Sequence, residues 1–97
     1  MVLIKIKEVP SSREALKERV RRAWRINPNR LYNQDQAIAV HKGEVLEVYK
    51  ILGYTKDAIE PDRVAFELEE MESDLKGKHI VSRTSNPCTI VDSLDFK

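Results

Sequence analysis

The sequence predicts a small α+β domain: a mainly antiparallel barrel or bent sheet of five to six strands, with one amphipathic helix after the first strand. Two observations lead to this prediction. Residues 11–26 repeat their apolar positions with the period of a helix, whereas the other apolar runs are short and mostly alternate with polar residues, as strands do. With 97 residues, the chain has the size of a single domain spanning 1–97 and a modest core.

The helix prediction depends on signals at both ends of residues 11–26. Ser11 and Glu14 have the spacing of a capping box, which satisfies the first free backbone N–H groups of a helix, so we expect the helix to begin there. Asn27 precedes Pro28, and a residue before proline is disfavoured in the helical conformation. We therefore expect the helix to run as far as residue 26.

The strand predictions depend on apolar patterning and on turn residues. Residues 37–40 and 45–52 are rich in apolar side chains and flank Gly43, which tolerates the positive φ of a tight turn, so they predict a hairpin. Within 45–52 we expect Val45 and Tyr49 on one face and Leu46 and Val48 on the other. The remaining expectations are strands at 2–9, 63–70, 79–82 and 89–91, a turn or single helical turn at 30–34, a polar loop at 53–62, a loop at 83–87, and Leu94 with Phe96 as a last strand segment or a tail.

Charge is divided unevenly along the chain. Residues 1–50 hold 11 lysines and arginines against 6 acidic residues, and residues 51–97 hold 6 against 10, so a basic half (+5) precedes an acidic half (−4). The formal net charge of the whole chain is only +1. A bipolar chain of this kind offers a basic face to a nucleic acid or an acidic face to a protein partner, and it is consistent with a monomer or a weak homo-oligomer.

The polar half of the predicted helix is the main candidate for binding. Its two acidic residues pair with basic neighbours at helical spacing, which leaves Arg21 and Arg25 as surplus cations. These two are either a phosphate site or part of a solvated face. Trp24 falls on the apolar half, so it belongs to the core or serves as a platform on which a base stacks.

Arg19 projects into the apolar half of the same helix, where an isolated charge is costly. Three explanations stay open. Its aliphatic stem lies along the edge of the core, or it binds an internal carboxylate, or it lines a ligand pocket. The candidate carboxylates are Asp35, Asp92 and Asp95.

Residues that carry metal or enzyme chemistry are scattered. His41, His79 and Cys88 lack the short spacing of zinc ligands, and no nucleotide-binding or hydrolase motif occurs. Glu67 and Glu69 share one strand face, but they belong to an acidic run typical of a solvated sheet edge. We therefore expect no metal, no cofactor and no catalytic residue, and an enzyme ranks third among the hypotheses.

The chain contains no apolar run of the ~18 residues that a membrane span needs, and its first residues lack the apolar core of a signal peptide. Its single cysteine excludes an internal disulfide. We expect a cytoplasmic protein that does not bind membranes.

The order of several segments resembles PUA-like domains of the ASCH and EVE type and small domains of bacterial and phage proteins. In such domains the helix after the first strand plugs a small barrel, and a central hairpin strand carries a Gly-x-(Val/Ile)-x-x-Val-(Tyr/Phe) pattern, which residues 43–49 match. The segments that carry the resemblance are AWRI at 23–26, AIAVHKGEVLEVYKI at 37–51, RVAFELE at 63–69, GKHIV at 77–81 and NPCTIVD at 86–92.

This resemblance implies a nucleic-acid-binding module for RNA, DNA or a modified base, with no catalysis of its own. The residues it implies, together with Arg19, are Arg21, Arg25 and Arg30 for phosphate, Trp24 or Tyr32 for stacking, and Asn33 and Gln34 for a base edge. The alternative is a small protein-interaction or regulatory protein, such as a phage accessory protein, that acts on a larger partner through the acidic stretch 67–74.

Overall fold

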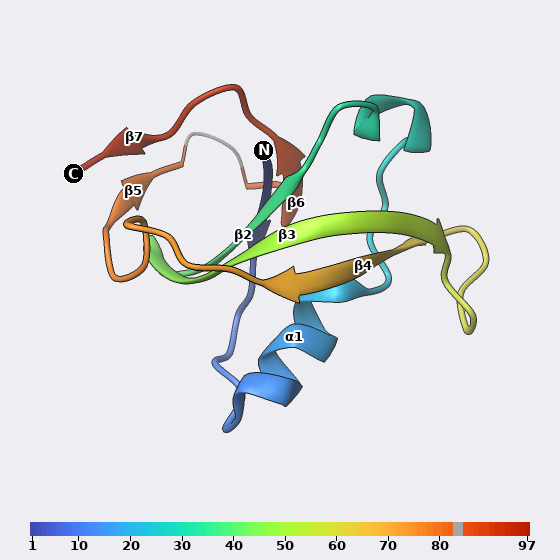
Figure 1. Ribbon diagram of the computed structural model, residues 1–97, viewed down its shortest axis with the longest axis horizontal. Coiled ribbons are helices and arrows are strands. Elements are labelled where there is room, and N and C mark those ends of the chain that lie inside the picture. Colours follow the sequence, from blue (N-terminus) through green and yellow to red (C-terminus); the bar gives the residue numbers. More distant parts are fainter. Residues whose placement is uncertain (83–84) are drawn as a thin grey trace.

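The computed structural model describes residues 1–82 and 85–97 and consists of one α-helix, one short 3₁₀-helix and two sheets (Figure 1). The elements in chain order are β1 (Val2–Lys5), α1 (Arg13–Arg21), the 3₁₀-helix η1 (Pro28–Leu31), β2 (Gln36–His41), β3 (Glu44–Lys56), β4 (Val64–Glu70), β5 (Ile80–Val81), β6 (Cys88–Ile90) and β7 (Asp95–Phe96). The chain is therefore the small α+β domain that the sequence predicts. The loop expected at 83–87 includes residues 83 and 84, which lie outside the described residues.

The main sheet is mixed and open. Its strand order is β4-β3-β2-β1-β6, and the edges β4 and β6 do not pair with each other, so the described strands do not close a barrel. β1 runs parallel to β2, and the other neighbours in this sheet are antiparallel. A parallel pair needs a long crossover, which here contains α1 and η1. A separate antiparallel pair, β5–β7, lies beside the sheet.

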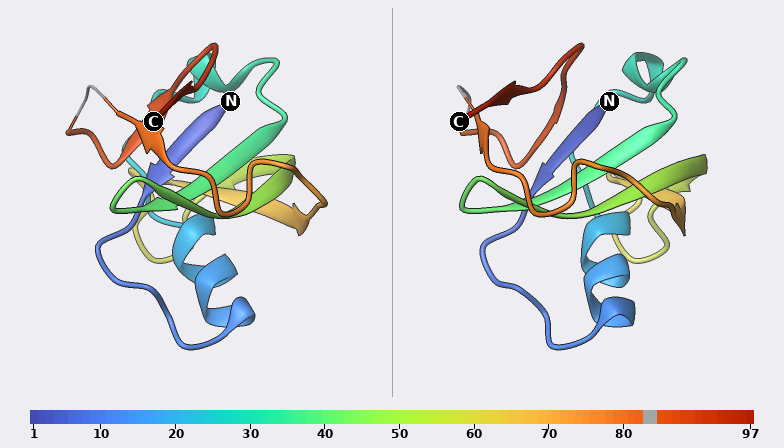
Figure 2. Two further views of the ribbon diagram at one scale, coloured as in Figure 1. Left: turned by 90° about the vertical axis from the view of Figure 1, so that its left-hand side faces the viewer. Right: turned by 60° about the vertical axis from the view of Figure 1, so that its left-hand side comes forward.

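Apolar side chains cover both faces of this sheet. On one face, Val2 and Ile4 of β1 pack in a cluster with Leu16 and Val20 of α1. On the other face, Leu3 packs in a second cluster that includes side chains of β2, β3 and β5. Figure 2 shows α1 on one side of the sheet and the segment carrying β5 and β7 on the other. The first strand is thus covered on both faces, which agrees with its place between β2 and β6 in the strand order.

The predicted faces of β3 are wrong because a β-bulge shifts its alternation. Ala39 pairs with Glu47 and Val40 with Val45, so Leu46 is the extra residue between the two pairs. As a result Val45 shares a cluster with Val48, and Leu46 packs against the cluster that holds Tyr49. β3 also continues to Lys56, because β4 pairs with residues that the sequence assigns to a loop.

Helix α1 begins one residue later than predicted. The side chain of Ser12, not Ser11, accepts a hydrogen bond of 3.1 Å from the backbone N–H of Ala15, so Ser12 is the N-cap. The residue after it, Arg13, is then the first helical residue.

The helix also ends five residues earlier than predicted, at Arg21 rather than residue 26. Arg22 is extended, Ala23 has the left-handed φ of 69°, and Trp24 forms an isolated β-bridge with Val64. The N–H of Trp24 donates to the carbonyl of Val64 at 3.1 Å, and the N–H of Val64 donates back at 2.9 Å. The backbone of Trp24 thus pairs with the edge of β4 instead of forming the last helical turn. This distant contact overrides the helical pattern of the local sequence.

We expect the substitution Ala23→Gly to raise the free energy of unfolding by about 1 kcal/mol, because a left-handed φ is unfavourable for a residue with a Cβ and not for glycine. Urea denaturation measures the change. The matched control is Ala65→Gly in the buried interior of β4, where the same exchange lowers stability. A loss of stability in both variants would contradict the claim that the left-handed φ of Ala23 is unfavourable for alanine.

Candidate functional site

A cavity of about 620 Å³ lies between the segment that follows α1 and strand β6. Among its lining residues in the described part of the chain, five are arginines and none is acidic. We call it the arginine pocket. It is lined by Arg19, Arg22, Ala23, Trp24, Arg25, Ile26, Asn27, Arg30, Arg63, Asn86, Pro87, Cys88 and Thr89.

The early end of α1 gives the pocket its inner wall. From Arg22 onward the chain is extended, and the Trp24–Val64 bridge fixes it against β4. A second contact comes from Arg63, whose Nη1 donates to the carbonyl of Ala23 at 3.2 Å. Within the extended segment Trp24 is buried and Arg25 is exposed, so one side chain goes to the core and the next to solvent.

Arg22 forms the strongest ion pair of the pocket. Its Nε and Nη2 donate to Oδ1 and Oδ2 of Asp57 at 2.9 and 2.5 Å. The same carboxylate accepts hydrogen bonds from the backbone N–H groups of Ile59 and Glu60, and Asp57 is only 3% exposed. Donors to its charged form hold the pKa of Asp57 well below its usual range, and the hydrogen bond with Asp57 raises the pKa of Arg22. Arg22 therefore joins the end of α1 to the β3–β4 connection, and its charge is matched.

Trp24 belongs to the core, as the first of its two sequence interpretations states. It is 5% exposed, and its indole Nε1 donates to the carbonyl of Val20 at 2.6 Å. The guanidinium carbon of Arg19 lies 5.1 Å from the centre of the indole ring. Arg19 is exposed, and the described residues contain no carboxylate paired with it, so it lies at the core edge and lines the pocket without an internal ion pair.

The remaining arginines supply the charge that the pocket offers. Arg25 and Arg30 are exposed, and neither side chain has a hydrogen bond or ion pair to any residue that the structure describes. Arg63 is half-buried, and its Nε is buried with no hydrogen-bond partner among the described residues. With the exposed Arg19, the pocket thus has three exposed cations and a fourth, Arg63, whose guanidinium is only partly satisfied.

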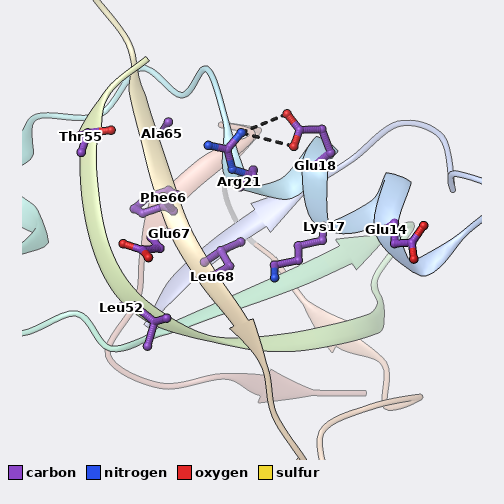
Figure 3. A pocket seen from close by; sticks show the side chains of 10 residues that line it. All are labelled: Glu14, Lys17, Glu18, Arg21, Leu52, Thr55, Ala65, Phe66, Glu67 and Leu68. Carbon is purple, nitrogen blue, oxygen red and sulfur yellow. Dashed lines mark hydrogen bonds and ion pairs between the residues drawn. The ribbon is translucent and has the colours of Figure 1, made fainter. Parts of the chain in front are cut away.

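Four residues expected at the site lie outside the arginine pocket. Arg21 lines a different cavity beside β4 and pairs with Glu18 at 3.0 Å (Figure 3). Gln34 accepts a hydrogen bond of 2.7 Å from the N-terminal amine, and Tyr32 is 79% exposed next to Asn33, which has a positive φ. The structure therefore brings together Arg19, Trp24, Arg25 and Arg30 and separates them from Arg21, Tyr32, Asn33 and Gln34.

Sequence reasoning missed Arg63 and the β6 residues of the pocket. The sequence pattern marks Arg63 only as the start of a strand, and Thr89 only as part of another. Both reach the pocket through the sheet topology, since Arg63 directly precedes β4, whose first residue pairs with Trp24, and β6 pairs with β1. No local signal in the sequence distinguishes either residue as part of a site.

Cys88 lines the pocket but is not an activated nucleophile. Burial raises the pKa of its thiol to about 12, so the thiol stays protonated at neutral pH. His41 is tied elsewhere, with Nδ1 3.1 Å from the carbonyl oxygen of Ile6. In the part of the chain that the structure describes, no three histidine, cysteine or carboxylate side chains gather as metal ligands would, and no helix has the length and apolar character to cross a membrane.

No protein-family model matches this chain, and comparison with curated proteins and with solved structures found no match either.

We expect Asp57→Asn to lower the melting temperature at pH 7, because Arg22 then faces a neutral amide in place of a carboxylate. The depressed pKa of Asp57 gives the direction of the pH dependence. Its contribution to stability is complete above the unfolded carboxyl pKa of about 3.9 and is lost as the pH falls below it. Thermal unfolding followed by circular dichroism should therefore show the gap between the two proteins narrowing below about pH 4.

The matched control for this experiment is Asp62→Asn, an exposed carboxylate in the same connection. It should leave the melting temperature near that of the unsubstituted protein at every pH. A gap for Asp57→Asn that stays constant down to about pH 3 would contradict the ion pair as its cause.

Proposed function

We propose that this chain is a nucleic-acid-binding module for RNA, DNA or a modified base, with no catalysis of its own, and that it holds the phosphate backbone at the arginine pocket. The observation that carries the proposal is the lining of that pocket: five arginines in one cavity, with no acidic residue among the described residues that line it. A nucleic acid is the polyanion that such a lining fits, since neutralising its phosphates releases counterions and supplies most of the affinity.

Arg25 and Arg30 are the primary phosphate contacts in this proposal. Both guanidinium groups are exposed and without partners in the described structure, so binding does not require an internal ion pair to break. A guanidinium presents paired donors that match two phosphate oxygens, which adds geometry to the charge. Arg19 and the side chains of Asn27 and Thr89 extend the same lining with further donors.

Arg22 has a supporting role, because its charge is matched by Asp57. It holds the extended segment so that Arg25 projects to solvent beside it. Arg63, directly before β4, also holds this segment, because its guanidinium donates to the carbonyl of Ala23. The five arginines thus divide into three exposed ligand contacts, Arg19, Arg25 and Arg30, and two half-buried supports, Arg22 and Arg63.

Base recognition takes a smaller part in this proposal than in the sequence interpretation. Trp24 presents little ring surface, and Arg19 already lies over it. Of the two aromatic residues expected at the site, Tyr32, two residues after Arg30, is the exposed one and is available for stacking. Contacts made mainly to phosphate position a nucleic acid without reading its sequence, so we propose weak sequence preference. The PUA-like resemblance stays a prediction.

The test is fluorescence anisotropy with labelled single-stranded and double-stranded oligonucleotides at a series of salt concentrations. We expect binding whose affinity falls as salt rises, with a slope that counts the phosphates neutralised, about 0.7 per phosphate for a single strand and about 0.9 for a duplex. Absence of binding at protein concentrations up to about 100 μM in low salt would overturn the proposal.

The variants Arg25→Gln and Arg30→Gln test whether the arginine pocket is the site of nucleic-acid binding. Each should weaken binding at low salt and reduce the salt slope by about one phosphate contact. The matched control is Lys42→Gln, which removes the same charge at the exposed β2–β3 turn, away from the pocket lining. An equal loss in the control would show that only the overall charge matters and would contradict a site at the arginine pocket.

A further inference from the structure

A second cavity of about 620 Å³ lies along β4, whose outer edge has no partner strand in the sheet. It is lined by residues 65–68 of β4, by four charged side chains of α1, and by Leu52 and Thr55 of β3. We call this cavity the edge slot. Glu67 and Phe66 point to opposite faces of β4 and both line it, so the slot reaches both faces of the strand around its outer edge. Figure 3 shows Lys17 and Arg21 reaching from α1 toward β4 across it.

The backbone groups of β4 that point into the slot can be identified from the hydrogen bonds of its neighbours. The carbonyl of Arg63 accepts from Asp57 and the N–H of Met71 donates to Val48, so these odd-numbered residues turn their bonding groups toward β3. Val64 instead exchanges both of its bonds with Trp24 on the outer side. Alternation then turns the N–H and C=O groups of Phe66 and Leu68 outward. Among the described residues, neither of these two has a hydrogen-bond partner on that side.

The two ends of the slot are fixed. At one end the Trp24–Val64 bridge is already a first antiparallel rung on this edge, which shows that the edge accepts a backbone partner. At the other end Arg13 of α1 pairs with Glu70 at 2.5 Å. The stretch of β4 between Val64 and Glu70 spans about 20 Å at the rise of a strand, which is room for a short extended segment.

The acidic side chains along this edge of β4 favour a basic partner over a second copy of this chain. Glu67 and Glu69 are exposed on one face of β4, and Glu67 lines the slot together with Leu52, a bulged residue that is 51% exposed. A second copy pairing through β4 would place glutamates against glutamates, which is unfavourable across strands. A lysine or arginine opposite Glu67 gains an ion pair across the strands.

We propose that the edge slot binds an extended segment of a protein partner by strand addition to β4, and that this segment carries lysine or arginine at alternate positions. Its backbone pairs with the free N–H and C=O groups of Phe66 and Leu68. Its basic side chains face Glu67 and Glu69, and the side chains between them face α1. This site is separate from the arginine pocket, so the proposal does not depend on nucleic-acid binding.

The direct test is amide hydrogen exchange followed by NMR, with a capped synthetic peptide of alternating valine and lysine as the probe. We expect the amides of Phe66 and Leu68 to exchange rapidly in the free protein and to become protected when the peptide is added. The same peptide with N-methyl groups on its pairing amides should give no protection, because it cannot form the ladder. Unchanged exchange at both amides with saturating peptide would overturn the proposal.

The protein variants test the choice of a basic partner. Glu67→Lys and Glu69→Lys should each weaken peptide binding about tenfold, because an attractive cross-strand pair becomes repulsive. Glu72→Lys, an exposed acidic residue just beyond β4, is the matched control and should change affinity little. Arg25→Gln should leave peptide binding intact. Equal losses of peptide affinity in all four variants would overturn the site. Protection of the Phe66 amide that grows with protein concentration, without peptide, would also overturn the proposal, because it would show that a second copy of this chain pairs with β4.

Discussion

The pair of backbone hydrogen bonds between Trp24 and Val64 is the constraint on which the rest of this structure depends. It ends α1 early, sets the left-handed turn at Ala23, and holds the following segment as an extended chain against β4. The buried indole of Trp24 strengthens it, since the side chain packs with the α1 cluster and donates its own hydrogen bond to Val20. The local sequence pattern alone predicts that residues 22–26 continue the helix, which would distribute the arginines around the helix axis.

This single bridge also separates the two candidate sites. On one side of the bridge lies the arginine pocket, which is lined by Arg22, Arg25 and Arg63 together with residues of β6. On the other side, the free edge of β4 begins directly after Val64 and faces α1. A basic surface and an acidic strand edge are thus held in one small domain by a contact that itself carries no charge.

Sequence reasoning could identify the elements whose signal is local, and it failed where a distant contact decides. The β2–β3 hairpin follows from apolar runs around Gly43, and the strand predicted at 63–70 matches β4. The open sheet with a parallel β1–β2 pair could not be deduced, because strand order depends on contacts between segments far apart in the sequence. The bulge at Leu46 likewise depends on how two strands fit together. For the site, Arg19 and Arg25 follow from charge and position on the predicted helix and Arg30 from the PUA-like resemblance, whereas Arg63 and Thr89 reach the pocket only through the folded topology.

The strand order also has a consequence for how the chain acquires its structure in time. β1 lies between β2 and β6, and Val2 pairs with both Ala37 and Ile90. The earliest strand is therefore completed by one of the latest, and closing such distant contacts is slow compared with forming a helix or a hairpin. During synthesis, β1 can pair on one side with β2 while its other edge stays open until residues 88–90 emerge. Over that interval the apolar edge of β1 is exposed, which makes the order of synthesis itself a hazard for aggregation.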